Sequence, residues 1–466
     1  MSKQVVTLIK GDGIGPEIAA AVKEIFIAAN VPITWEEAEA GLYCIERYGN
    51  GLPQETLDSI ARNKVALKAP TTTPIGGGHK SINVTIRKSL DLFANVRPSK
   101  SLPGIKTRFD NVDLIIVREN IEDTYGGIEY QQTPEVAQAL RLITRTGSRN
   151  AARYAFEMAK LEGRKTITCV HKANIQKMTD GLFLRSFQED AAEYPEIKSN
   201  DILIDNLCMQ LVTRPEQFDV LLLPNLFGDI ASDLCAGLVG GLGVAPGGNI
   251  GRDAAVFEAV HGSAPDIAGK GLANPMALLL SGVQMLRYLG LNSYADRIEQ
   301  ALRLTLVSGI KTRDLGGNAN TREFTHAIIS ELGAVTAQKE DEESAETSVS
   351  SKITLPVEHI LVDTAEWDLV GVDVFVRSNG LPTLPESIGK FTLSMISNRG
   401  TKIYPGVVPD IHLSDCFRSR WISTESVTNA DVLDLMSNFP EQYPWMHIEK
   451  LHKQGDTSLY SKAQGE

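Results

Sequence analysis

The chain has 466 residues, of which 42% are hydrophobic and 22% charged, the profile of a globular protein with several domains. Asp and Glu number 58 against 46 Lys and Arg, and this formal net charge of −12 argues against nucleic acid or an anionic membrane as the main partner. The five cysteines are far apart and odd in number, which argues against a disulfide framework or a structural zinc site.

The termini and apolar stretches favour a cytoplasmic protein. No signal-peptide pattern opens the sequence, and the longest apolar stretch, near residues 276–286, is shorter than the ~20 residues that cross a membrane. We expect a reducing compartment because the cysteine pattern is not that of a disulfide-linked protein. A local basic pocket for a small anion remains compatible with the overall acidity.

The first predicted strand covers residues 5–9 and leads into the glycine-rich segment 11–15. This segment is similar to the dinucleotide-binding fingerprint G-x-G-x-x-G, but Pro16 takes the place of the third glycine, so the match fails and a tight structural turn is favoured. A proline suits the first position of a helix. The apolar residues that then recur at helical spacing are Ile18, Val22, Ile25 and Phe26.

Three arginines are candidate anion ligands. Arg87 closes the segment Ser81-Ile82-Asn83-Val84-Thr85-Ile86-Arg87, Arg97 follows shortly after, and Arg118 ends a predicted strand at 114–117. Because a guanidinium group matches a carboxylate, converging arginines would suit a di- or tricarboxylic acid. Taken singly, each arginine is more often a surface ion-pair partner. Arg118 is the exception, because open α/β sheets bind ligands at the carboxyl ends of strands.

Two residues are candidates for proton transfer. Tyr125 lies in Glu119-Asn120-Ile121-Glu122-Asp123-Thr124-Tyr125, and Lys172 follows a predicted strand at 166–169. Arginines and a metal near a partly buried tyrosine or lysine can lower its pKa into a useful range. A packed tyrosine and a surface lysine are the alternatives.

An acidic pair follows the predicted strand 220–223. Asp229 and Asp233 are four residues apart at a predicted helix start, so both carboxylates lie on one helix face and can reach one cation. Oxygen ligands of this kind suit Mg²⁺. The alternative is a helix cap with a solvated aspartate. Further on, the loop 261–269 is rich in small residues that let a backbone approach a nucleotide closely.

The end of the chain predicts a linker and a second domain. Continuous apolar strands with helices between them indicate an α/β body up to about residue 335, and the acidic, Ser/Thr-rich segment 336–353 is predicted to be a linker. In the tail, residues 370–376 alternate as a strand, and strands at 391–397 and 401–404 flank the turn 398–400. A helix is predicted around Val432, Leu435, Met436 and Phe439, with Thr428 or Asn429 as its cap. The tail therefore reads as a small α+β module.

Three of these segments together carry a family resemblance. Gly11-Asp12-Gly13-Ile14-Gly15-Pro16-Glu17, the segment 225–233 and His261-Gly262-Ser263-Ala264-Pro265 match, in order and spacing, the metal-dependent β-decarboxylating dehydrogenases. This is the family of isocitrate, 3-isopropylmalate, homoisocitrate and tartrate dehydrogenases, and the resemblance covers residues 5 to about 335. The tail resembles the C-terminal extension of some bacterial isocitrate dehydrogenases.

The resemblance implies a doubly wound α/β body without the Rossmann fingerprint. A large cofactor-binding domain would pair residues 1–104 with 255–335, and a small substrate and dimerisation domain would span residues 105–254. The linker 336–353 would then lead to an α+β extension at 354–466. Active sites shared between subunits imply a homodimer, and the extension implies a higher oligomer only by analogy.

The resemblance also implies residue roles. Arg87, Arg97 and Arg118 would bind the substrate, Tyr125 would be the general acid, and Lys172, contributed across the dimer interface, would act in hydroxyl deprotonation. Mg²⁺ or Mn²⁺ would be bound by Asp229 and Asp233 together with Asp205 from the other subunit. The implied cofactor-binding residues are Thr73, Asn174, His261, Gly262, Ser263, Ala264, Asp266, Ile267 and Asn274.

Two pairs of residues indicate the branch of the family and the cofactor. Ser81 and Asn83 resemble the isocitrate branch, where they address a third carboxylate, whereas an apolar substrate tail would leave both unpaired. NADP-preferring members resemble one another in a Lys-Tyr pair after the loop proline. Here the pair is Asp266-Ile267, and a carboxylate repels a 2′-phosphate, so we expect NAD.

The expected activity is oxidative decarboxylation of isocitrate to 2-oxoglutarate and CO₂ in the tricarboxylic acid cycle. One alternative is homoisocitrate dehydrogenase, because one extra methylene changes binding by only ~1–3 kcal/mol. The others are isopropylmalate dehydrogenase and a non-catalytic regulatory subunit of the same fold. A regulatory subunit should have lost Tyr125, Lys172 or a metal-binding aspartate, and all are present. A further alternative makes the tail a tethered binding module.

Overall fold

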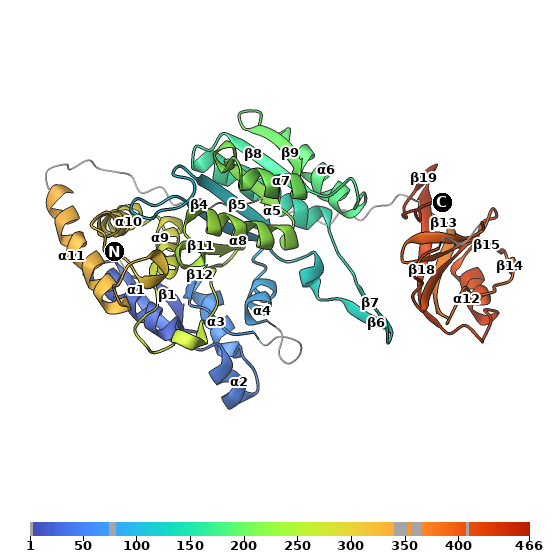
Figure 1. Ribbon diagram of the computed structural model, residues 1–466, viewed down its shortest axis with the longest axis horizontal. Coiled ribbons are helices and arrows are strands. Elements are labelled where there is room, and N and C mark those ends of the chain that lie inside the picture. Colours follow the sequence, from blue (N-terminus) through green and yellow to red (C-terminus); the bar gives the residue numbers. More distant parts are fainter. Residues whose placement is uncertain (1–2, 74–80, 340–352, 354, 356–365, 407–409) are drawn as a thin grey trace. The chain divides into compact units, whose positions relative to one another are not determined.

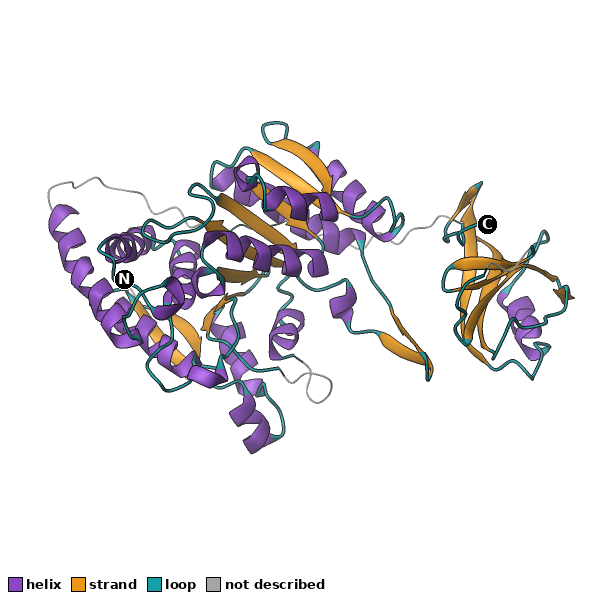
Figure 2. Ribbon diagram, in the orientation of Figure 1, coloured by secondary structure: helices purple, strands orange, loops and turns teal. Residues whose placement is uncertain are grey.

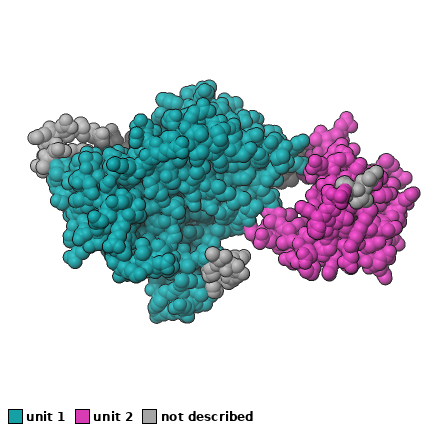
Figure 3. Space-filling view, in the orientation of Figure 1, with its two compact units in different colours: residues 1–126, 141–358 teal, residues 127–140, 359–466 magenta. Residues whose placement is uncertain are grey.

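The computed structural model of the protein describes residues 3–73, 81–339, 353, 355, 366–406 and 410–466. It contains two compact units (Figure 3): unit 1 comprises residues 1–126 and 141–358, and unit 2 comprises residues 127–140 and 359–466. The last helix of unit 1 continues to Lys339, and nearly all the rest of the linker predicted at 336–353 lies outside the described residues.

A ten-stranded sheet forms the centre of unit 1 (Figure 1). Its strands are β1 (Gln4–Ile9), β2 (Ile33–Ala38), β3 (Val65–Lys68), β4 (Ala94–Lys100), β5 (Asp113–Glu119), β8 (Thr166–His171), β9 (Lys198–Leu203), β10 (Val220–Leu223), β11 (Pro246–Ile250) and β12 (Ala255–Ala259). They lie in the order β2-β1-β3-β12-β11-β4-β5-β10-β8-β9. Neighbours are parallel except at the centre, where β12–β11, β11–β4 and β4–β5 are antiparallel.

Helices cover both faces of this sheet (Figure 2). They are α1 (Gly15–Ala28), α2 (Leu42–Tyr48), α3 (Gln54–Asn63), α4 (Ile82–Ser89), α5 (Arg145–Leu161), α6 (Thr179–Ala191), α7 (Ile204–Leu211), α8 (Asn225–Val239), α9 (Met276–Tyr288), α10 (Asn292–Val307) and α11 (Thr321–Lys339). The helix predicted after Pro16 is α1, and it buries the four apolar residues expected of it. The predicted α/β body is confirmed, but the sequence did not indicate its antiparallel centre.

The strand registers gather polar side chains on one face of the sheet. Asn95 of β4 is paired with both Arg118 of β5 and Asn249 of β11. Directly paired residues and those two positions apart share a face, so Arg97 and Glu258 project on the same side. α8 packs over β4 and β5 on this side. The centre of the sheet thus presents a polar floor beneath α8.

The glycine-rich segment forms a tight turn, as predicted. Gly11 and Gly13 have φ of +63° and +57°, and a Cβ at Gly13 would lie 2.0 Å from the carbonyl oxygen of Ser263. Between them, the Asp12 carboxylate accepts hydrogen bonds from the backbone N–H of Leu42 and of Thr72, both at 2.8 Å. The turn therefore holds the loop at Ser263 and the loop at Thr72 against β1.

Unit 2 contains a seven-stranded sheet with one helix. Its elements are β13 (Asp368–Arg377), β14 (Ser387–Ile388), β15 (Phe391–Asn398), β16 (Thr401–Tyr404), β17 (Cys416–Ile422), α12 (Asn429–Ser437), β18 (Trp445–Gln454) and β19 (Thr457–Ser458), together with a hairpin of β6 (Glu129–Thr133) and β7 (Val136–Ala139). The α+β module is confirmed, and so is the cap, because Asp431 accepts hydrogen bonds from the backbone N–H and hydroxyl of Thr428. The sequence did not indicate that the hairpin joins this unit, where Thr133 Oγ1 donates to Asp415 Oδ1 at 2.7 Å.

All five cysteines are free. Within the described residues, no helix is both long and apolar enough to cross a membrane. The cytoplasmic location stays a prediction.

The geometry of the turn predicts a strong effect of Gly13→Ala. A left-handed φ alone costs an L-residue about 1–2 kcal/mol, and here the new methyl group would also collide with the Ser263 carbonyl. We expect a lower thermal unfolding midpoint and a displaced loop at Ser263. The control is Gly49→Ala, because Gly49 has φ of +71° but no atom within 4 Å of the place its new methyl group would take, so only the backbone cost applies. Equal losses of stability in the two variants would contradict this account.

Candidate active site

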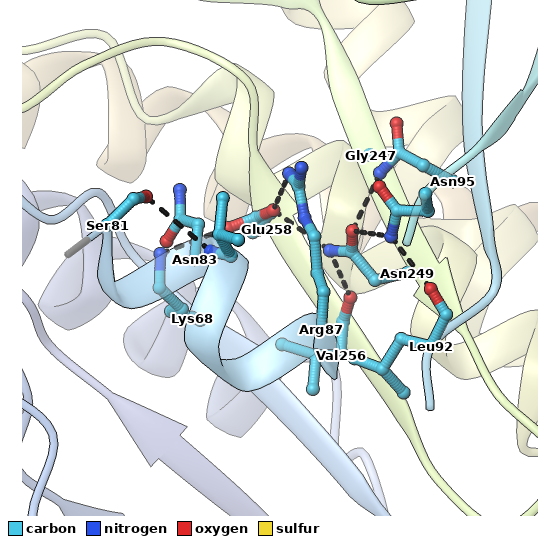
Figure 4. A network of polar contacts seen from close by, with 12 residues as sticks. Lys68, Ser81, Asn83, Arg87, Leu92, Asn95, Gly247, Asn249, Val256 and Glu258 are labelled. Carbon is cyan, nitrogen blue, oxygen red and sulfur yellow. Dashed lines mark hydrogen bonds and ion pairs between the residues drawn. The ribbon is translucent and has the colours of Figure 1, made fainter. Parts of the chain in front are cut away.

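Glu258 is the centre of a buried ionic cluster (Figure 4). It lies in β12, and its carboxylate is 3.0 Å from Lys68 Nζ at the end of β3 and 3.1 Å from Arg87 Nη2 of α4. Lys68, Arg87 and Glu258 are all buried. Glu258 therefore fixes the position of two cationic groups that come from different elements.

A chain of asparagines supports this cluster from the neighbouring strands (Figure 4). Asn249 Nδ2 donates to Glu258 Oε1 at 2.9 Å, while its Oδ1 accepts hydrogen bonds from Asn95 at 2.9 Å and Asn120 at 3.0 Å. Asn120 in turn donates to the carbonyl of Leu92. Each amide orients the next, so the carboxylate has little freedom to rotate away from its cations.

Burial alone would raise the pKa of the Glu258 carboxyl group. The charges of Lys68 and Arg87 and the hydrogen bond from Asn249 outweigh burial, and the pKa lies below its usual value. Glu258 is therefore a carboxylate at neutral pH, as a partner of two cations must be.

A second cluster joins β5 to α8. The guanidinium of Arg118 forms an ion pair with Asp229 and donates to Asn225 Oδ1 through Nε at 3.0 Å and Nη2 at 2.7 Å. Its Cζ lies 4.9 Å from the ring centroid of Tyr125. Burial, together with the positive charges of Arg97 and Arg87, lowers the pKa of Arg118 to about 10. This crowding of cations favours the approach of an anion.

Arg97 connects the two aspartates of α8. It donates to Ser232 Oγ at 2.5 Å and lies 3.4 Å from an oxygen of Asp229 and 3.6 Å from one of Asp233. Burial opposes ionisation of Asp229, but Arg118 and Arg97 bring its pKa below the usual value. For Asp233, burial and the charge of Asp229 prevail over Arg97, and its pKa is raised. The acidic pair of α8 is thus in direct contact with Arg97, and Asp229 also with Arg118.

Tyr125 faces the same aspartate. It lies in the 3-10 helix η1 (Thr124–Gly126), and its hydroxyl donates to Asp229 Oδ2 at 2.5 Å. Burial and the hydrogen bond to Asp229 raise its pKa, outweighing the positive charge of Arg118. The arginines of the chain therefore do not lower this pKa by themselves, and a lowering by arginines and a metal together stays a prediction. Tyr125 is a protonated phenol beside a carboxylate.

A pocket lies over the Glu258 cluster. Its lining residues are Lys68, Pro70, Thr71, Asn83, Arg87, Asn95, Arg97, Gly247, Glu258, Ala259, Val260, His261 and Gly262. Within the described residues, three buried nitrogen atoms of this lining have no hydrogen-bond partner: Arg87 Nε, Arg97 Nε and His261 Nε2. Burial lowers the pKa of His261, which favours the neutral imidazole. The N–H groups of the two arginines are therefore available as donors to an anionic ligand.

Lys172 and Asp205 lie elsewhere in unit 1. Lys172 Nζ is 2.5 Å from Asp205 Oδ1 at the start of α7, and the Lys172 backbone N–H donates to Asp180 Oδ2 at 2.6 Å. Among the described interactions within the chain, none joins this pair to Asp229 or Tyr125. The structure therefore brings together only part of the predicted site in one chain.

Of the remaining predicted residues, some form hydrogen bonds within the chain and others are exposed. Ser81 caps α4 by accepting a hydrogen bond from Val84 N, and Asn83 accepts one from Thr71 at 3.2 Å. Ser263 Oγ and Thr72 Oγ1 are hydrogen-bonded at 2.6 Å, and Asn274 Oδ1 accepts a hydrogen bond from Met276 N, the first residue of α9, at 3.0 Å. The exposed residues among those predicted to bind the cofactor are Thr73, Asn174, Gly262 and Asp266, with Ala264 and Ile267 partly buried. Ser81, Ser263 and Asn274 thus have structural bonds that the sequence did not indicate.

The donor set for a metal ion is incomplete within one chain. In the part of the chain that the structure describes, no three His, Cys, Asp or Glu side chains are grouped as a metal site. Asp229 and Asp233 nevertheless offer carboxylate oxygens on one face of α8, which suits a hard divalent cation. Asp229 and Asp233 therefore fit part of a metal site. A third protein ligand would have to come from outside the residues that lie near them in this chain.

Lys68, Asn95, Asn249 and Glu258 were missed in the sequence analysis. A signal was present, because Glu258 interrupts the apolar run Ala255-Val256-Phe257-Glu258-Ala259, and a charged residue inside a buried strand needs a partner. The partner itself was not readable, since Lys68 lies 190 residues away.

Comparisons with known proteins match both units. The model of the isocitrate/isopropylmalate dehydrogenase family matches residues 5–328, and that of the C-terminal domain of bacterial isocitrate dehydrogenase matches residues 367–466. A protein of Thermus thermophilus named isocitrate dehydrogenase [NADP] is 44% identical over all of this chain and 96% of its own length. A mitochondrial catalytic subunit of isocitrate dehydrogenase [NAD] from Arabidopsis thaliana is 56% identical over 70% of this chain and 88% of its own.

Solved structures agree with the sequence comparisons. A crystal structure of a protein from Thermus thermophilus superimposes with a TM-score of 0.89 at 45% identity, covering 99% of this chain and 96% of the other. The fold of both units is therefore shared with known structures.

The Glu258 cluster predicts a stability change in Glu258→Gln. The amide leaves Lys68 and Arg87 buried without a counter-charge, and removing one partner of a buried ion pair costs about 3–5 kcal/mol. We therefore expect a lower urea unfolding midpoint at pH 7, whereas Glu46→Gln, at an exposed position of α2, should leave it unchanged.

The same variant has a predicted pH dependence. The Glu258 pKa is lower in the folded than in the unfolded chain, so its stabilising contribution is present above the unfolded value of 4.5 and is lost as the pH falls below it. Glu258→Gln should therefore lose less stability than the natural chain between pH 6 and pH 3. An identical acid-induced loss in both proteins would show that Glu258 is not held as a carboxylate.

Proposed function

The chain belongs to the isocitrate/isopropylmalate dehydrogenase family, and from this premise we propose that it converts isocitrate to 2-oxoglutarate and CO₂, reducing NAD with the help of Mg²⁺ or Mn²⁺. The observation that carries the proposal is that Arg87 and Arg97 line one pocket, while Arg118 lies in the adjacent Asp229 cluster, which Arg97 also contacts. With Lys68, four cationic groups meet three carboxylates there, which suits a substrate with several negative charges.

Polar residues at the N-terminal end of α4 support a tricarboxylic substrate. Asn83 lines the pocket one helical turn before Arg87, and Ser81 starts the same helix. An alkyl group, as in isopropylmalate, would lie against the Asn83 amide without satisfying it, whereas a carboxylate can accept its hydrogen bonds. The Nε groups of Arg87 and Arg97 offer two more donors to the substrate.

The proposed metal site combines residues of two subunits. Asp229 and Asp233 would bind the cation from α8, and Asp205 would come from α7 of a second copy, as the family resemblance implies. Within one chain Asp205 is paired with Lys172 instead. When bound, Mg²⁺ or Mn²⁺ would stabilise negative charge on substrate oxygens during loss of CO₂. This arrangement makes a homodimer the active form.

Tyr125 and Lys172 are the proposed groups for proton transfer. Tyr125 keeps its proton at neutral pH because burial and Asp229 raise its pKa, so it can deliver a proton to the substrate carbon after decarboxylation. Lys172, held at its backbone by Asp180, would accept or relay the proton of the substrate hydroxyl in the site of the other subunit. The arginines hold the carboxylates still while these transfers occur.

NAD is proposed as the cofactor because of an acidic residue in the loop that follows His261. Asp266 is exposed in the 3-10 helix η4 (Pro265–Ile267), where a carboxylate can accept hydrogen bonds from ribose hydroxyls and repels a 2′-phosphate. The Arabidopsis relative is named for NAD, but the Thermus relative, which is similar over the whole chain, is named for NADP. NADP is therefore the competing cofactor.

A panel of 2-hydroxy acids tests the activity. Isocitrate, homoisocitrate and isopropylmalate would each be assayed with NAD and with NADP, with and without Mg²⁺. We expect the highest kcat/KM with isocitrate, and at least about a tenfold preference for NAD, equivalent to about 1.4 kcal/mol. Activity should be lost on chelation and restored by Mg²⁺ or Mn²⁺. A preference for another acid would overturn the substrate, and a preference for NADP would overturn the cofactor.

The proposed role of Tyr125 predicts that Tyr125→Phe affects hydride transfer and 2-oxoglutarate formation to different extents. Hydride transfer should be retained better than 2-oxoglutarate formation, which should fall by about 10²-fold or more because the proton donor is lost. Rapid-quench measurement of reduced cofactor and 2-oxoglutarate would separate the two. Tyr48→Phe, at an exposed position on α2, is the control. Undiminished formation of 2-oxoglutarate would remove the proposed role.

A further inference from the structure

Two fully buried carboxylates share one guanidinium in unit 1. Arg141 Nε donates to Asp123 Oδ1 at 2.6 Å, its Nη2 lies 3.2 Å from Asp123 Oδ2, and its Nη1 forms an ion pair with Asp180. Both aspartates have an exposed fraction of 0%. Arg141 also lies with its Cζ 5.0 Å from the ring centroid of Phe227. This triad is outside the pocket described above, and neither the arginine nor the aspartates have a role in the proposed reaction.

The Asp123 end of the triad holds Tyr125. Asp123 has φ of +66°, a left-handed conformation that is uncommon for non-glycine residues but that Asp and Asn adopt more often than others. Its carboxylate accepts hydrogen bonds from Thr124 N at 2.8 Å and from Leu226 N, in the first turn of α8, at 3.0 Å. Its carbonyl accepts one from Gly126 N. Asp123 thereby joins the turn that carries Tyr125 to the helix that carries Asp229.

The Asp180 end holds Lys172. Asp180 lies in the first turn of α6, and its Oδ2 accepts the backbone N–H of Lys172 at 2.6 Å while its Oδ1 faces Arg141. Lys172 directly follows β8, and its side chain extends to Asp205. Loss of the charge on Asp180, or of its partner, would release the backbone at Lys172.

We propose that Arg141 is a positioning residue that connects the Tyr125 of one active site to the Lys172 that serves the other. The inference rests on the proposed function, in which Lys172 acts across the dimer interface. In that arrangement, the two ends of one intrachain triad belong to two different catalytic centres. A shift of Arg141 then disturbs both centres at once, although Arg141 touches no substrate.

Mixed dimers test the two ends separately. One subunit carries Tyr125→Phe and the other Lys172→Met, so one site contains both changes and the other is intact. The intact site uses Lys172 of the first subunit and Tyr125 of the second. Arg141→Lys is then added to either subunit: the ammonium keeps the charge but cannot reach Asp123 and Asp180 in three directions.

We expect Arg141→Lys to lower kcat for isocitrate about tenfold or more from either subunit, because displacement of a reacting group by ~1 Å is costly. KM should change less than twofold, since the arginines of the pocket are untouched. The control is Arg145→Met, at the first residue of α5 and four residues after Arg141. It removes an exposed ion pair with Glu189 and should change neither kcat nor KM.

Each other result overturns the inference in its own way. No loss of kcat from either subunit would show that Arg141 positions neither group, and a loss from only one would confine it to one centre. An inactive mixed dimer beside an active natural enzyme would refute the shared sites, whereas an inactive natural enzyme would refute the proposed function itself. If the Arg141→Lys chain does not fold, the near-isosteric Asp180→Asn should lower kcat when placed in the subunit that supplies Lys172, and unchanged kcat there would overturn the proposal.

Discussion

The site depends on holding several cations together in a buried place. Arg87, Arg97 and Arg118 repel one another, and burial deprives each of water, which is why the pKa of Arg118 is lowered. Two carboxylates offset the free-energy cost of burying these cations: Glu258, beneath the pocket, pairs with Arg87, and Asp229, on α8, pairs with Arg118. The carboxylates leave some guanidinium N–H groups unused, and these are the donors that a multiply charged anion can satisfy. The same gathering of buried cations therefore lowers the stability of the empty site and favours the binding of an anion.

The architecture of the sheet makes this arrangement possible. Antiparallel pairing of β12, β11, β4 and β5 places residues from four strands in register on one face. Glu258, Asn249, Asn95 and Arg118 consequently form a continuous polar layer, with α4 and α8 adding their side chains from above. A uniformly parallel sheet would have collected its ligands at one edge, whereas here they lie across the centre.

Local patterns predicted much of the fold and part of the site. Apolar runs predicted β1, β5, β8 and β10, and the spacing of Asp229 and Asp233 predicted two carboxylates on one helix face. That this face lies near the arginines was implied only by the family resemblance. Glu258 and Lys68 were not predicted, because their pairing depends on a long-range strand register that no local pattern contains. For the charges that the chain itself supplies, the pKa of Tyr125 is raised, because of burial and a hydrogen bond to Asp229 that joins η1 to α8 and that no local pattern contains. The predicted domain boundaries within unit 1, the cofactor and the dimer stay predictions.

The hairpin of β6 and β7 has a consequence for dissecting the protein. The chain enters unit 2 at residue 127, returns to unit 1 at residue 141 and enters unit 2 again at residue 359. Gln132 and Thr133 of the hairpin are buried within unit 2, where Thr133 is bonded to Asp415. A protein shortened at the linker would keep the hairpin but lose Asp415, so the buried Thr133 hydroxyl would have no partner in the ribbon that remains between Tyr125 and Arg141. A clean excision would need a short bridging turn in place of residues 127–140 as well as the terminal cut.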